Sequence, residues 1–446
     1  MHEMRVPAAE GSMSPGNDRT GLLAPPVPNR PKKRLPEGLR SLGRRDYRVF
    51  FFSQLFSLTG TWMQSLAQAW LVLTLTDSPA ALGLIGVFQF GPTLLLGLPA
   101  GVLVDRLPKR KLLLITQIAA AIITSVLAFQ VGRGAIELWQ IYAAAMALGI
   151  VTAIDMPARQ SFVVDLVGKE NLMNGIALNA AVFNTTRVVG PALAGLILAR
   201  FGPEICFVVN SLSYLPVVAG LVVMHTEGLP QRGSNAGSAL ERLREGLAYV
   251  RRTAEVRLPI ILAGLMAIFG MNFGVWAPLL ARDALDIGAS GFGLLMSSLG
   301  IGSLTGALTL AFTGRRLSSQ RLLATALLFG LFEIALGMAA GLGAPAIVAM
   351  VLMAGIGFSM STTMTQANTT VQTNTPDHLR GRVMSIYLTV FAGSTPIGAA
   401  LAGLISEAWG SPMAVAAGGA IVAIIAIVIG RRLAKVEHRV HEAMSE

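Results

Sequence analysis

Apolar segments long enough to cross a lipid bilayer recur along almost the whole sequence. A helix rises about 1.5 Å per residue, so roughly 20 apolar residues span the ~30 Å hydrocarbon core of a membrane. Twelve segments meet this requirement, at residues 48–75, 80–104, 111–131, 138–158, 174–199, 203–224, 258–281, 290–313, 320–341, 344–369, 383–406 and 411–430. The sequence therefore predicts an all-α integral membrane protein with twelve transmembrane helices.

The distribution of charge along the chain agrees with this prediction. Hydrophobic residues make up 53% of the sequence, charged residues 13%, and the formal net charge is +11. Such a basic chain could bind nucleic acid, but the cytoplasmic loops of multi-pass membrane proteins also retain Lys and Arg. With the amino terminus placed inside, only Arg133, Arg200 and Arg282 of the 35 Lys and Arg residues fall in predicted outer loops. We therefore expect a plasma-membrane protein with both termini cytoplasmic, in contact with membrane lipid and without a nucleic-acid partner.

The predicted spans divide into two groups of six, separated by the longest interior polar stretch. We expect a disordered cytoplasmic tail (residues 1–46), a first six-helix bundle (47–224), a cytoplasmic linker (225–257), a second six-helix bundle (258–432) and a cytoplasmic tail (433–446). An amphipathic helix on the inner membrane surface is predicted within the linker, from the helical spacing of Leu240, Leu243, Leu247 and Val250. This helix either only joins the two bundles or also binds a partner.

The two halves of the chain are similar to each other in sequence. The stretch GPALAGLI that starts at Gly190 matches GAALAGLI from Gly398, and KLLL from Lys111 matches RLLA from Arg321. The spacing between matched stretches is nearly constant, which is strong evidence of a duplicated unit. Because each unit contains an even number of spans, the two repeats are parallel in the membrane. The sequence therefore predicts two pseudo-symmetric six-helix bundles.

A charged stretch follows the second predicted span at once, in the segment GLPAGVLVDRLPKRK. The polarity changes along the helix axis rather than around it, as it does where a helix leaves the bilayer. This stretch resembles the loop signature of the major facilitator superfamily, Gly-x-x-x-Asp-Arg-x-Gly-Arg-Arg, through Gly101, Asp105, Arg106, Lys109 and Arg110. Pro108 replaces the usual glycine and Lys109 a usual arginine, so the turn is expected to be stiffer than in the family pattern.

A more specific resemblance covers nearly the whole chain after residue 41. The exporter branch that includes the enterobactin exporter and macrolide-type drug efflux proteins is similar to the stretches RRDYRVFFFSQLFSLTGTWMQSLAQAWLVLTLT, DMPARQSFVVDLV, NGIALNAAVFNTTRVVGPALAG and DHLRGRVMSIYLTVF. This resemblance implies a major facilitator fold in a bacterial cytoplasmic membrane. It also implies export of a small amphipathic molecule, of drug or siderophore type, driven by the proton gradient. Gly190 and Pro191 resemble the glycine-proline signature of antiporter fifth helices, although the longer glycine series is incomplete.

We expect the charged loop to act as a gate, with Gly101, Asp105, Arg106 and Arg110 as the gating residues. Asp105 is predicted to lie against the amino-terminal end of span 11, near Gly381 to Ser385. The helix dipole favours an anion there by about 0.3–1 kcal/mol. Such a latch can hold the inner ends of the two bundles together and release when they rock apart. For the cations of the loop, anchoring at the inner membrane surface is the alternative.

Polar residues follow one face of two predicted spans. Span 1 carries Gln54, Ser57, Thr61, Ser65 and Gln68, and span 10 carries Ser359, Thr362, Gln366, Thr369 and Thr373. Because lipid penalises such stripes, we expect them to face the bundle interior and to form two walls of a central cavity. Hydrogen bonding between helices, without substrate contact, is an equal alternative. The candidate cavity residues are Gln54, Thr61, Gln68, Arg187, Trp276 and Gln366.

Three ionisable side chains lie inside or at the edge of predicted spans, where burial is expensive. Arg187, near mid-depth in span 5, is expected to attract an anionic group of a substrate or to pair with an acid. Glu333, inside span 9, has no evident cation nearby and is one candidate for proton coupling; a satisfied packing residue is the alternative. Asp155, near the inner end of span 4, is the other candidate, although pairing with Arg159 or Arg106 is favoured.

No pattern in the sequence indicates an enzyme, a cofactor or a metal site. The single cysteine, Cys206, lies in an apolar run, and the histidines fall in tails or loops. No catalytic triad or phosphate loop suggests a hydrolase or an ATP-driven pump. We expect a monomer whose partners are a small-molecule substrate and protons. A nutrient importer of the same fold and a non-transporting scaffold or sensor stay open, because fold alone decides neither direction nor flux.

Overall fold

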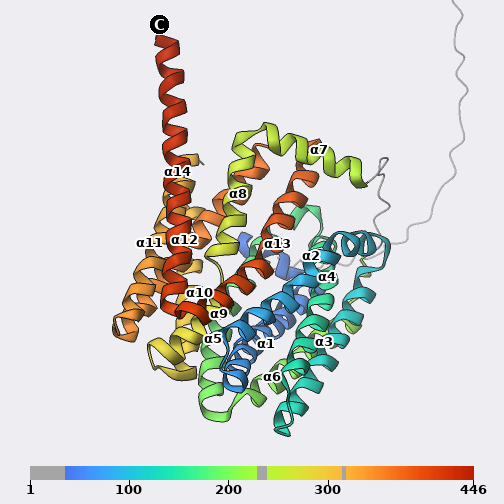
Figure 1. Ribbon diagram of the computed structural model, residues 1–446. Coiled ribbons are helices and arrows are strands. Elements are labelled where there is room, and N and C mark those ends of the chain that lie inside the picture. The colour runs from blue at the N-terminus through green and yellow to red at the C-terminus, as the bar shows by residue number, and fades with distance from the viewer. Residues whose placement is uncertain (1–35, 229–238, 314–317, 446) are drawn as a thin grey trace, which may run out of the picture.

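The computed structural model of the chain describes residues 36–228, 239–313 and 318–445, and long helices dominate these ranges, with no strand among them (Figure 1). The first six long helices are α1 (Arg45–Thr76), α2 (Pro79–Arg106), α3 (Lys109–Gly132), α4 (Leu138–Val167), α5 (Leu172–Phe201) and α6 (Pro203–Val223). The later helices are α7 (Ala239–Arg252), α8 (Ala254–Phe269), α9 (Phe273–Leu279), α10 (Gly288–Thr313), α11 (Ser319–Gly341), α12 (Ala346–Thr373), α13 (Asp377–Trp409) and α14 (Ser411–Ser445). The predicted all-α fold is confirmed.

Eleven helices in the described part of the chain are long and apolar enough to cross a membrane. One of these candidates, Ala254–Ala284, combines α8, α9 and the π-helical turn that follows them. The helix α1 is not among the eleven, since the Ser, Thr and Gln side chains along it lower its hydropathy. The count of twelve spans therefore stays a prediction.

Local sequence signals account for several helix ends. The Ser78 hydroxyl accepts a hydrogen bond from the backbone N–H of Ala81 (3.2 Å), and a proline occupies the first turn of α2. Glu137 and Gln140 form a reciprocal capping box at the start of α4. At the end of α5, Gly202 has a φ of 82°, a left-handed backbone that favours glycine and stops the helix.

Three helices are longer than the apolar segments that predict them. The helix α4 runs to Val167 instead of ending near residue 158, and α13 begins at Asp377 instead of 383. The helix α14 continues to Ser445, past the predicted end at residue 430. The apolar pattern stops where a helix leaves the membrane, whereas the backbone hydrogen bonds of the helix continue into water.

The seventh predicted span, residues 258–281, is not one continuous helix. Between α8 and α9 the side-chain amide of Asn272 donates to the carbonyl oxygen of Ile268 (2.8 Å). The ring of Phe329 in α11 lies 2.4 Å from the position of a Cβ on Gly270, so this side chain packs into the break. A π-helical turn, Leu280–Ala284, follows α9. Breaks of this kind are tolerated in membrane helices when neighbouring helices cover them.

The helices α1 to α6 pack against one another, as do α8 to α14, and the two sets meet where α2 contacts α13 and α5 contacts α10 (Figure 1). Glycines bring these backbones close together. A Cβ on Gly83 of α2 would lie 2.5 Å from the carbonyl oxygen of Ala399, and one on Gly293 of α10 would lie 2.6 Å from the Cα of Gly195. Small residues at membrane helix interfaces allow such close approach.

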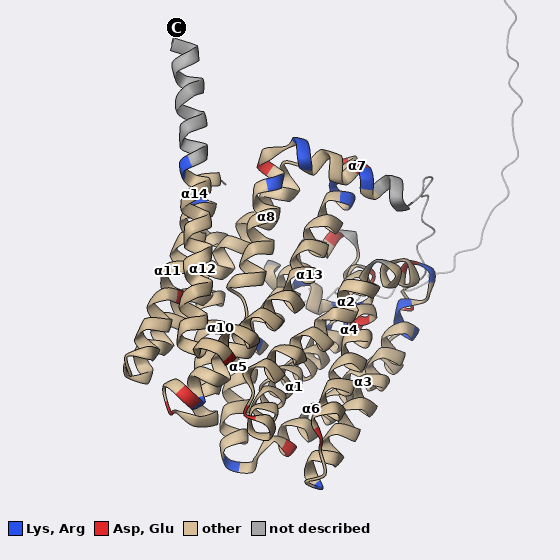
Figure 2. Ribbon diagram, in the orientation of Figure 1, with Lys and Arg blue, Asp and Glu red and all other residues tan. Residues whose placement is uncertain are grey.

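The helix α7 lies at one end of the molecule and is attached to the second set of helices (Figure 1). Glu245 forms an ion pair with Arg382 in the first turns of α13, and the Tyr249 hydroxyl donates to the carbonyl oxygen of Asn374 (2.6 Å). Lys and Arg are plentiful at this end, which we call the α7 end (Figure 2). We call the opposite end the distal end.

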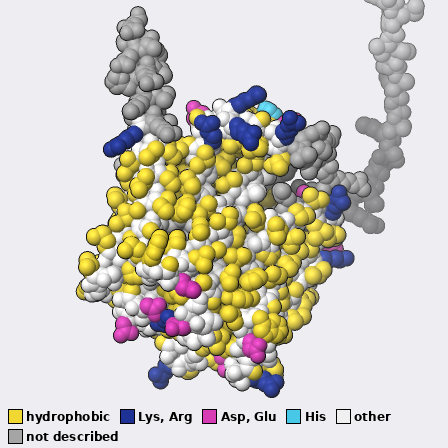
Figure 3. Space-filling view, viewed as in Figure 1, with side chains coloured by type: hydrophobic (Ala, Val, Ile, Leu, Met, Phe, Trp, Pro, Cys, Tyr) yellow, Lys and Arg dark blue, Asp and Glu magenta, His cyan; other side chains and the backbone are white. Residues whose placement is uncertain are grey.

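Hydrophobic side chains form a broad band between the two ends of the molecule, with charged side chains mainly above and below it (Figure 3). This surface suits a protein surrounded by lipid. The predicted domain boundaries stay predictions. Residues 1–35 of the predicted tail, residues 229–238 of the linker, and Arg315 and Arg316 in the loop after α10 lie outside the described residues.

Candidate functional site

Arg282 joins the two sets of helices at the distal end. Its Nη2 lies 2.6 Å from Oδ1 of Asp77, and its Nη1 donates to the carbonyl oxygen of Leu73 (3.1 Å). Asp77 and Leu73 lie at the end of α1, whereas Arg282 lies in the π-helical turn after α9. The adjacent Asp283 also pairs with the guanidinium, with Nε 2.5 Å from Oδ1.

Glu407 makes a second connection between the sets at the same end. Its Oε2 accepts hydrogen bonds from the Ser78 hydroxyl and from the backbone N–H of Ala80, each at 2.9 Å. A carboxylate from α13 therefore caps the start of α2, where the helix dipole is positive. We call the contacts of Arg282 and Glu407 with Asp77, Leu73, Ser78 and Ala80 the distal bridge.

The distal bridge is absent from the sequence-based candidates. Arg282 enters the sequence analysis only as one of three cations in predicted outer loops, and Asp77 and Glu407 do not enter it. Few charged residues occur in or beside the short connections at this end. That scarcity is the sequence signal that could have identified Arg282, Asp77 and Glu407 as candidates. Their partners come from helices far apart in the chain, so spacing along the sequence does not reveal the pairing.

The two sets separate toward the α7 end. On α2, Leu94 approaches α13 closely, because its Cδ1 would lie 2.6 Å from a Cβ on Gly393. Gly101 and Gly381 lie farther toward the α7 end on these helices, and a Cβ on either would have no neighbouring atom within 4 Å. Together with the distal bridge, these contacts hold the two sets against each other toward the distal end. From the lack of close neighbours at Gly101 and Gly381 we infer an opening between the sets at the α7 end.

Exposure along α5 shows the same asymmetry. Ile176, Phe183 and Ala194 lie on one face of this helix, between its contacts with α1 and with α10. The side chains nearer the α7 end are exposed, Ile176 by 52% and Phe183 by 46%, whereas Ala194 near the distal end is fully buried. This face of α5 therefore lines the opening between the two sets.

Arg187 lies on the same face, between Phe183 and Ala194. It is half-buried, and it makes no hydrogen bond or ion pair with any residue that the structure describes. Its backbone carbonyl oxygen lies 2.8 Å from the position of a Cβ on Gly300, so this part of α5 contacts α10 directly. The structure thus holds an unpaired guanidinium where the two sets of helices meet.

Aromatic side chains lie beside this position. The rings of Trp62 in α1 and Phe183 in α5 meet edge to face, with centroids 6.0 Å apart. Trp62 also packs over Gly190, the first residue of the glycine-proline pair noted in the sequence. Thr61, the neighbour of Trp62, is exposed, and its hydroxyl donates to the carbonyl oxygen of Ser57 (2.9 Å). Apolar and cationic groups are thus combined on this part of the opening.

The other candidate cavity residues are packed within the bundles. Gln54 and Gln68 of α1 are 2% and 4% exposed, and Trp276 of α9 is 2% exposed. The Gln366 amide donates to the carbonyl oxygen of Thr362 (3.2 Å) and to the Thr325 hydroxyl of α11 (3.4 Å). Gln366 is therefore engaged in a hydrogen bond with a neighbouring helix of its own bundle, which for this residue is the alternative that the sequence left open.

Asp155 is buried and has several donors. Its Oδ1 accepts hydrogen bonds from the Thr116 hydroxyl and the Gln117 amide, each at 2.8 Å. Its Oδ2 pairs with the Arg159 guanidinium, and Nε of Arg159 lies 3.0 Å away. The favoured pairing with Arg159 is therefore present, and this carboxylate is held inside the first set of helices.

Glu333 is fully buried in α11, and neither carboxyl oxygen has a hydrogen-bond partner among the described residues. Its Oε2 lies 3.2 Å from the position of a Cβ on Gly270, so the carboxyl group points at the break between α8 and α9. Gly419 of α14 packs against its Cβ, at 2.6 Å from a Cβ placed on that glycine. The alternative that the sequence left open was a packing residue whose carboxyl oxygens have hydrogen-bond partners. Glu333 lacks such partners among the described residues.

The charged loop between α2 and α3 is attached to the first set of helices. Nζ of Lys109 lies 2.7 Å from Oδ2 of Asp165, and Arg110 donates from Nε to Leu221 (2.5 Å) and from Nη2 to Val222 (2.7 Å), both carbonyl oxygens at the end of α6. A cation at a helix carboxyl end is favourable. Arg110 is thus held in place by the structure.

Asp105 and Arg106, by contrast, are exposed and make no contact of this kind with any described residue. The predicted latch between Asp105 and the start of α13 is therefore not formed in this structure.

As for metals, the described residues contain no group of three His, Cys, Asp or Glu side chains that could hold an ion.

The chain is similar to known membrane transporters. The family model described as transmembrane secretion effector matches residues 38–445. The staphyloferrin A transporter of Staphylococcus aureus is 26% identical over 367 residues, covering 81% of this chain and 90% of that protein. The multidrug efflux pump Tap of Mycolicibacterium fortuitum is 27% identical over 373 residues, covering 81% and 89%.

The enterobactin exporter EntS of Escherichia coli is 25% identical over 400 residues, covering 88% of this chain and 92% of that protein. Among solved structures, a POT family transporter in complex with a thioalcohol-conjugated peptide superimposes with a TM-score of 0.73 at 14% identity, covering 88% of this chain and 96% of that chain. The likeness in structure shows the fold alone.

Proposed function

The chain belongs to the transmembrane secretion effector family, within the major facilitator superfamily, and we propose that it exports a small anionic amphipathic molecule by alternating access. It is a membrane transporter and not an enzyme. Export is supported by relatives named as an exporter of enterobactin and as a multidrug efflux pump.

The unpaired guanidinium of Arg187 carries the proposal. An uncompensated cation at membrane depth is expensive, so such residues mark paths and binding sites for a counter-charge. A substrate carboxylate or similar anion would pair with Arg187 in the opening between the two sets of helices. Phe183 and Trp62 beside it would contact the apolar part of the same molecule. Among the predicted cavity residues, Thr61 and Arg187 are retained in this proposal as substrate contacts.

Protons are the proposed driving ions, with Glu333 as the first candidate carrier. A carboxyl group without partners in an apolar setting is most stable when protonated, and it releases the proton when the surroundings change. The break between α8 and α9 beside it offers a part of the helix that can move. Asp155 is the second candidate, and its donors from Thr116, Gln117 and Arg159 favour a structural role.

In the proposed cycle, the structure corresponds to the inward-open state. We place the α7 end in the cytoplasm, with both termini, in agreement with the excess of Lys and Arg there. Opening to the outside would break the distal bridge and bring Asp105 against the start of α13. The proposed setting is a bacterial cytoplasmic membrane, where the protein acts as a monomer with two six-helix bundles joined by the α7 linker.

The test uses inverted membrane vesicles that contain the protein, with vesicles lacking it as the control. An imposed proton gradient is followed while matched pairs of aromatic amphiphiles are added, one member carrying a carboxylate and the other an amine. We expect the carboxylate compounds to be accumulated and to dissipate the gradient, and the amines to have no effect.

Different outcomes separate the alternatives. Accumulation of amines alone would reject the anionic substrate while retaining export. Accumulation of carboxylates only in right-side-out vesicles would point to an importer, and the absence of any flux or gradient change across a broad panel would favour a scaffold or sensor.

A further inference from the structure

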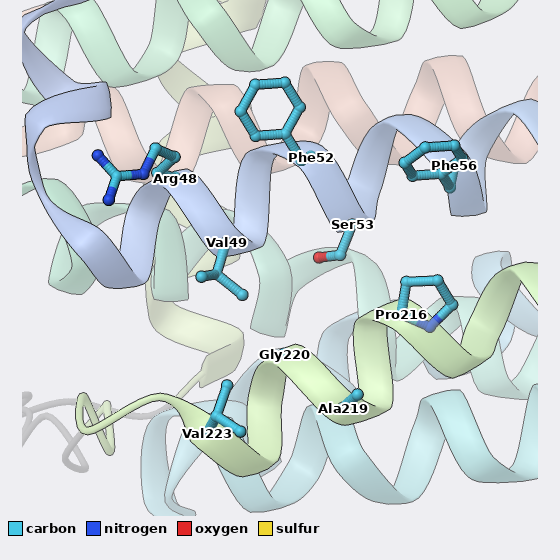
Figure 4. Close-up of a pocket in the computed structure, with 9 residues that line it drawn as sticks. All are labelled: Arg48, Val49, Phe52, Ser53, Phe56, Pro216, Ala219, Gly220 and Val223. Atoms are coloured by element: carbon cyan, nitrogen blue, oxygen red, sulfur yellow. The ribbon is translucent and has the colours of Figure 1, made fainter.

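A groove runs along the outside of the first set of helices, between α1 and α6 (Figure 4). It has a volume of about 540 Å³, and its lining includes neither Arg187 nor Thr61 and Trp62, which lie beside the opening. We call it the α1–α6 groove. Its surface is almost entirely apolar, except for Arg48 at one end and the Ser53 hydroxyl, which is bonded to the carbonyl oxygen of Phe50 (2.9 Å).

The sequence of the two helices explains why the groove exists. Phe52 and Phe56, one turn apart on α1, are 49% and 61% exposed, and they form one rim. The facing surface of α6 carries small side chains, among them Ala219 and Gly220, which leave the space between the helices unfilled. The helices nonetheless touch below the groove, because a Cβ on Gly220 would lie 3.0 Å from Cγ1 of Val49.

The length of the groove matches one half of a bilayer. Arg48 and Phe56 are eight residues apart on α1, which corresponds to about 12 Å along the helix axis. One leaflet contributes about 15 Å to the hydrocarbon core. An acyl chain can therefore lie along most of the groove while its headgroup stays at the level of Arg48.

The charge at the headgroup level is positive and not neutralised. Arg48 is exposed, and its guanidinium donates one long hydrogen bond, 3.4 Å from Nη1 to the carbonyl oxygen of Leu42. Arg45, one turn earlier, is also exposed and has no partner among the described residues. The neighbouring Asp46 is engaged elsewhere, because its Oδ2 accepts hydrogen bonds from the backbone N–H groups of His225 and Thr226, each at 3.0 Å.

From this geometry we propose that the α1–α6 groove binds an anionic phospholipid, with the phosphate paired to Arg48 and an acyl chain along Phe52 and Phe56. A guanidinium matches a phosphate through two parallel hydrogen bonds. A zwitterionic headgroup brings its own cation close to Arg45 and Arg48, so a net negative headgroup binds more tightly. The site is independent of the substrate path.

The test is native mass spectrometry of delipidated full-length protein, titrated with phosphatidylglycerol or phosphatidylcholine of the same acyl chains. A cation near the lipid surface is worth about 1 kcal/mol, which is roughly fivefold in affinity. We expect wild-type protein to bind phosphatidylglycerol more tightly, and Arg48→Gln to lose about fivefold for that lipid. Lys111→Gln removes an exposed cation at the same end, outside the groove, and is expected to bind like the wild type.

A second pair of variants tests the groove itself. Ala219→Trp places a large side chain in the groove, whereas Leu215→Trp alters an exposed position of α6 outside it. We expect only Ala219→Trp to weaken binding of both lipids. Equal binding of the two lipids by the wild type, equal binding by Arg48→Gln and Lys111→Gln, or unchanged binding in Ala219→Trp would each overturn the proposal. Melting temperatures of all four variants within the range of the wild type show that each is folded.

Discussion

At the scale of single residues, Arg187 and Glu333 differ from Asp155, the third ionisable side chain that the sequence places inside or at the edge of a span. Asp155 has Thr116, Gln117 and Arg159 as donors, so its burial is compensated. Arg187 and Glu333 have no such partners among the described residues. An uncompensated ionisable group in a membrane protein costs stability, so its presence suggests a role in transport.

Arg187→Gln is expected to weaken substrate binding in the vesicle assay. A hydrogen bond to a charged group contributes about 1.5–3 kcal/mol, so the KM for a carboxylate substrate should rise roughly 10- to 100-fold. Arg187→Lys keeps the charge and should recover part of the affinity. Arg200→Gln, at the exposed distal end of the same helix, is the control and should behave like the wild type. An unchanged KM in Arg187→Gln would remove Arg187 from the substrate site.

Glu333→Gln is expected to abolish proton movement coupled to substrate while leaving the fold intact. The amide cannot release a proton at any relevant pH, and the substitution removes a buried carboxyl group that lacks partners. Substrate addition should therefore no longer dissipate the gradient, and the melting temperature should stay equal or rise. Glu255→Gln, an exposed acid in the first turn of α8, serves as the control. Normal coupling in Glu333→Gln would move the proton to another acid.

At the scale of elements, glycines decide how closely the helices of the two sets approach. The helix α2 contains both kinds of position. Gly83 faces the backbone of Ala399, whereas Gly91 has no atom within 4 Å of a Cβ position. The same residue type on the same helix therefore has two different roles, and only the neighbouring helix distinguishes them.

Gly83→Ala and Gly91→Ala form a matched pair of substitutions. In an open helical position alanine is favoured over glycine by about 0.5–1 kcal/mol, so Gly91→Ala should leave the melting temperature unchanged or slightly raise it. Gly83→Ala places a Cβ 2.5 Å from a backbone oxygen, so α2 and α13 must separate and the melting temperature should fall. Thermal unfolding of the purified protein measures both. Equal melting temperatures would contradict the close contact of α2 with α13.

At the scale of the whole molecule, the distal bridge joins the two sets of helices at one end, while Asp105 and Arg106 at the α7 end make no contact with the second set among the described residues. Arg282→Gln should shift the population toward the outward-open state. An exposed ion pair contributes at most about 1 kcal/mol, so the shift should not exceed roughly fivefold. Distances between spin labels attached at residues 135 and 342 measure this shift in population. The buried Cys206 should not compete with these positions for labelling. Arg133→Gln is the control cation, and identical distance distributions in both variants would exclude the bridge from gating.

Asp105→Asn tests the latch that is not formed in this structure. Asp105 is exposed and has no described partner here, so the melting temperature of the variant should equal that of the wild type. The transport rate should fall several-fold, because the outward-open state would lose a contact of about 0.3–1 kcal/mol with the helix dipole of α13. A normal rate at normal protein abundance would reject the latch.

Much of the fold could be predicted because hydrophobicity and charge are properties of each residue by itself. Apolar runs identify the membrane helices, and the loop signature with the longer matched stretches indicates the family. The break at Gly270 and the extension of α4 to Val167 could not be read from the same pattern. Hydropathy reports where a segment meets lipid, whereas helix ends depend on backbone hydrogen bonds and on neighbouring helices.

The features of the candidate site likewise fall into those that the sequence determined and those that the tertiary structure decided. Sequence alone determined that Arg187 and Glu333 lie in apolar surroundings, because their own segments are apolar. Only the tertiary structure decided that both lack described partners, that Gln366 bonds to Thr325 within its bundle, and that Arg282 meets Asp77. The physical reason is distance along the chain: such partners lie on different helices, and helix packing alone brings them within hydrogen-bond range.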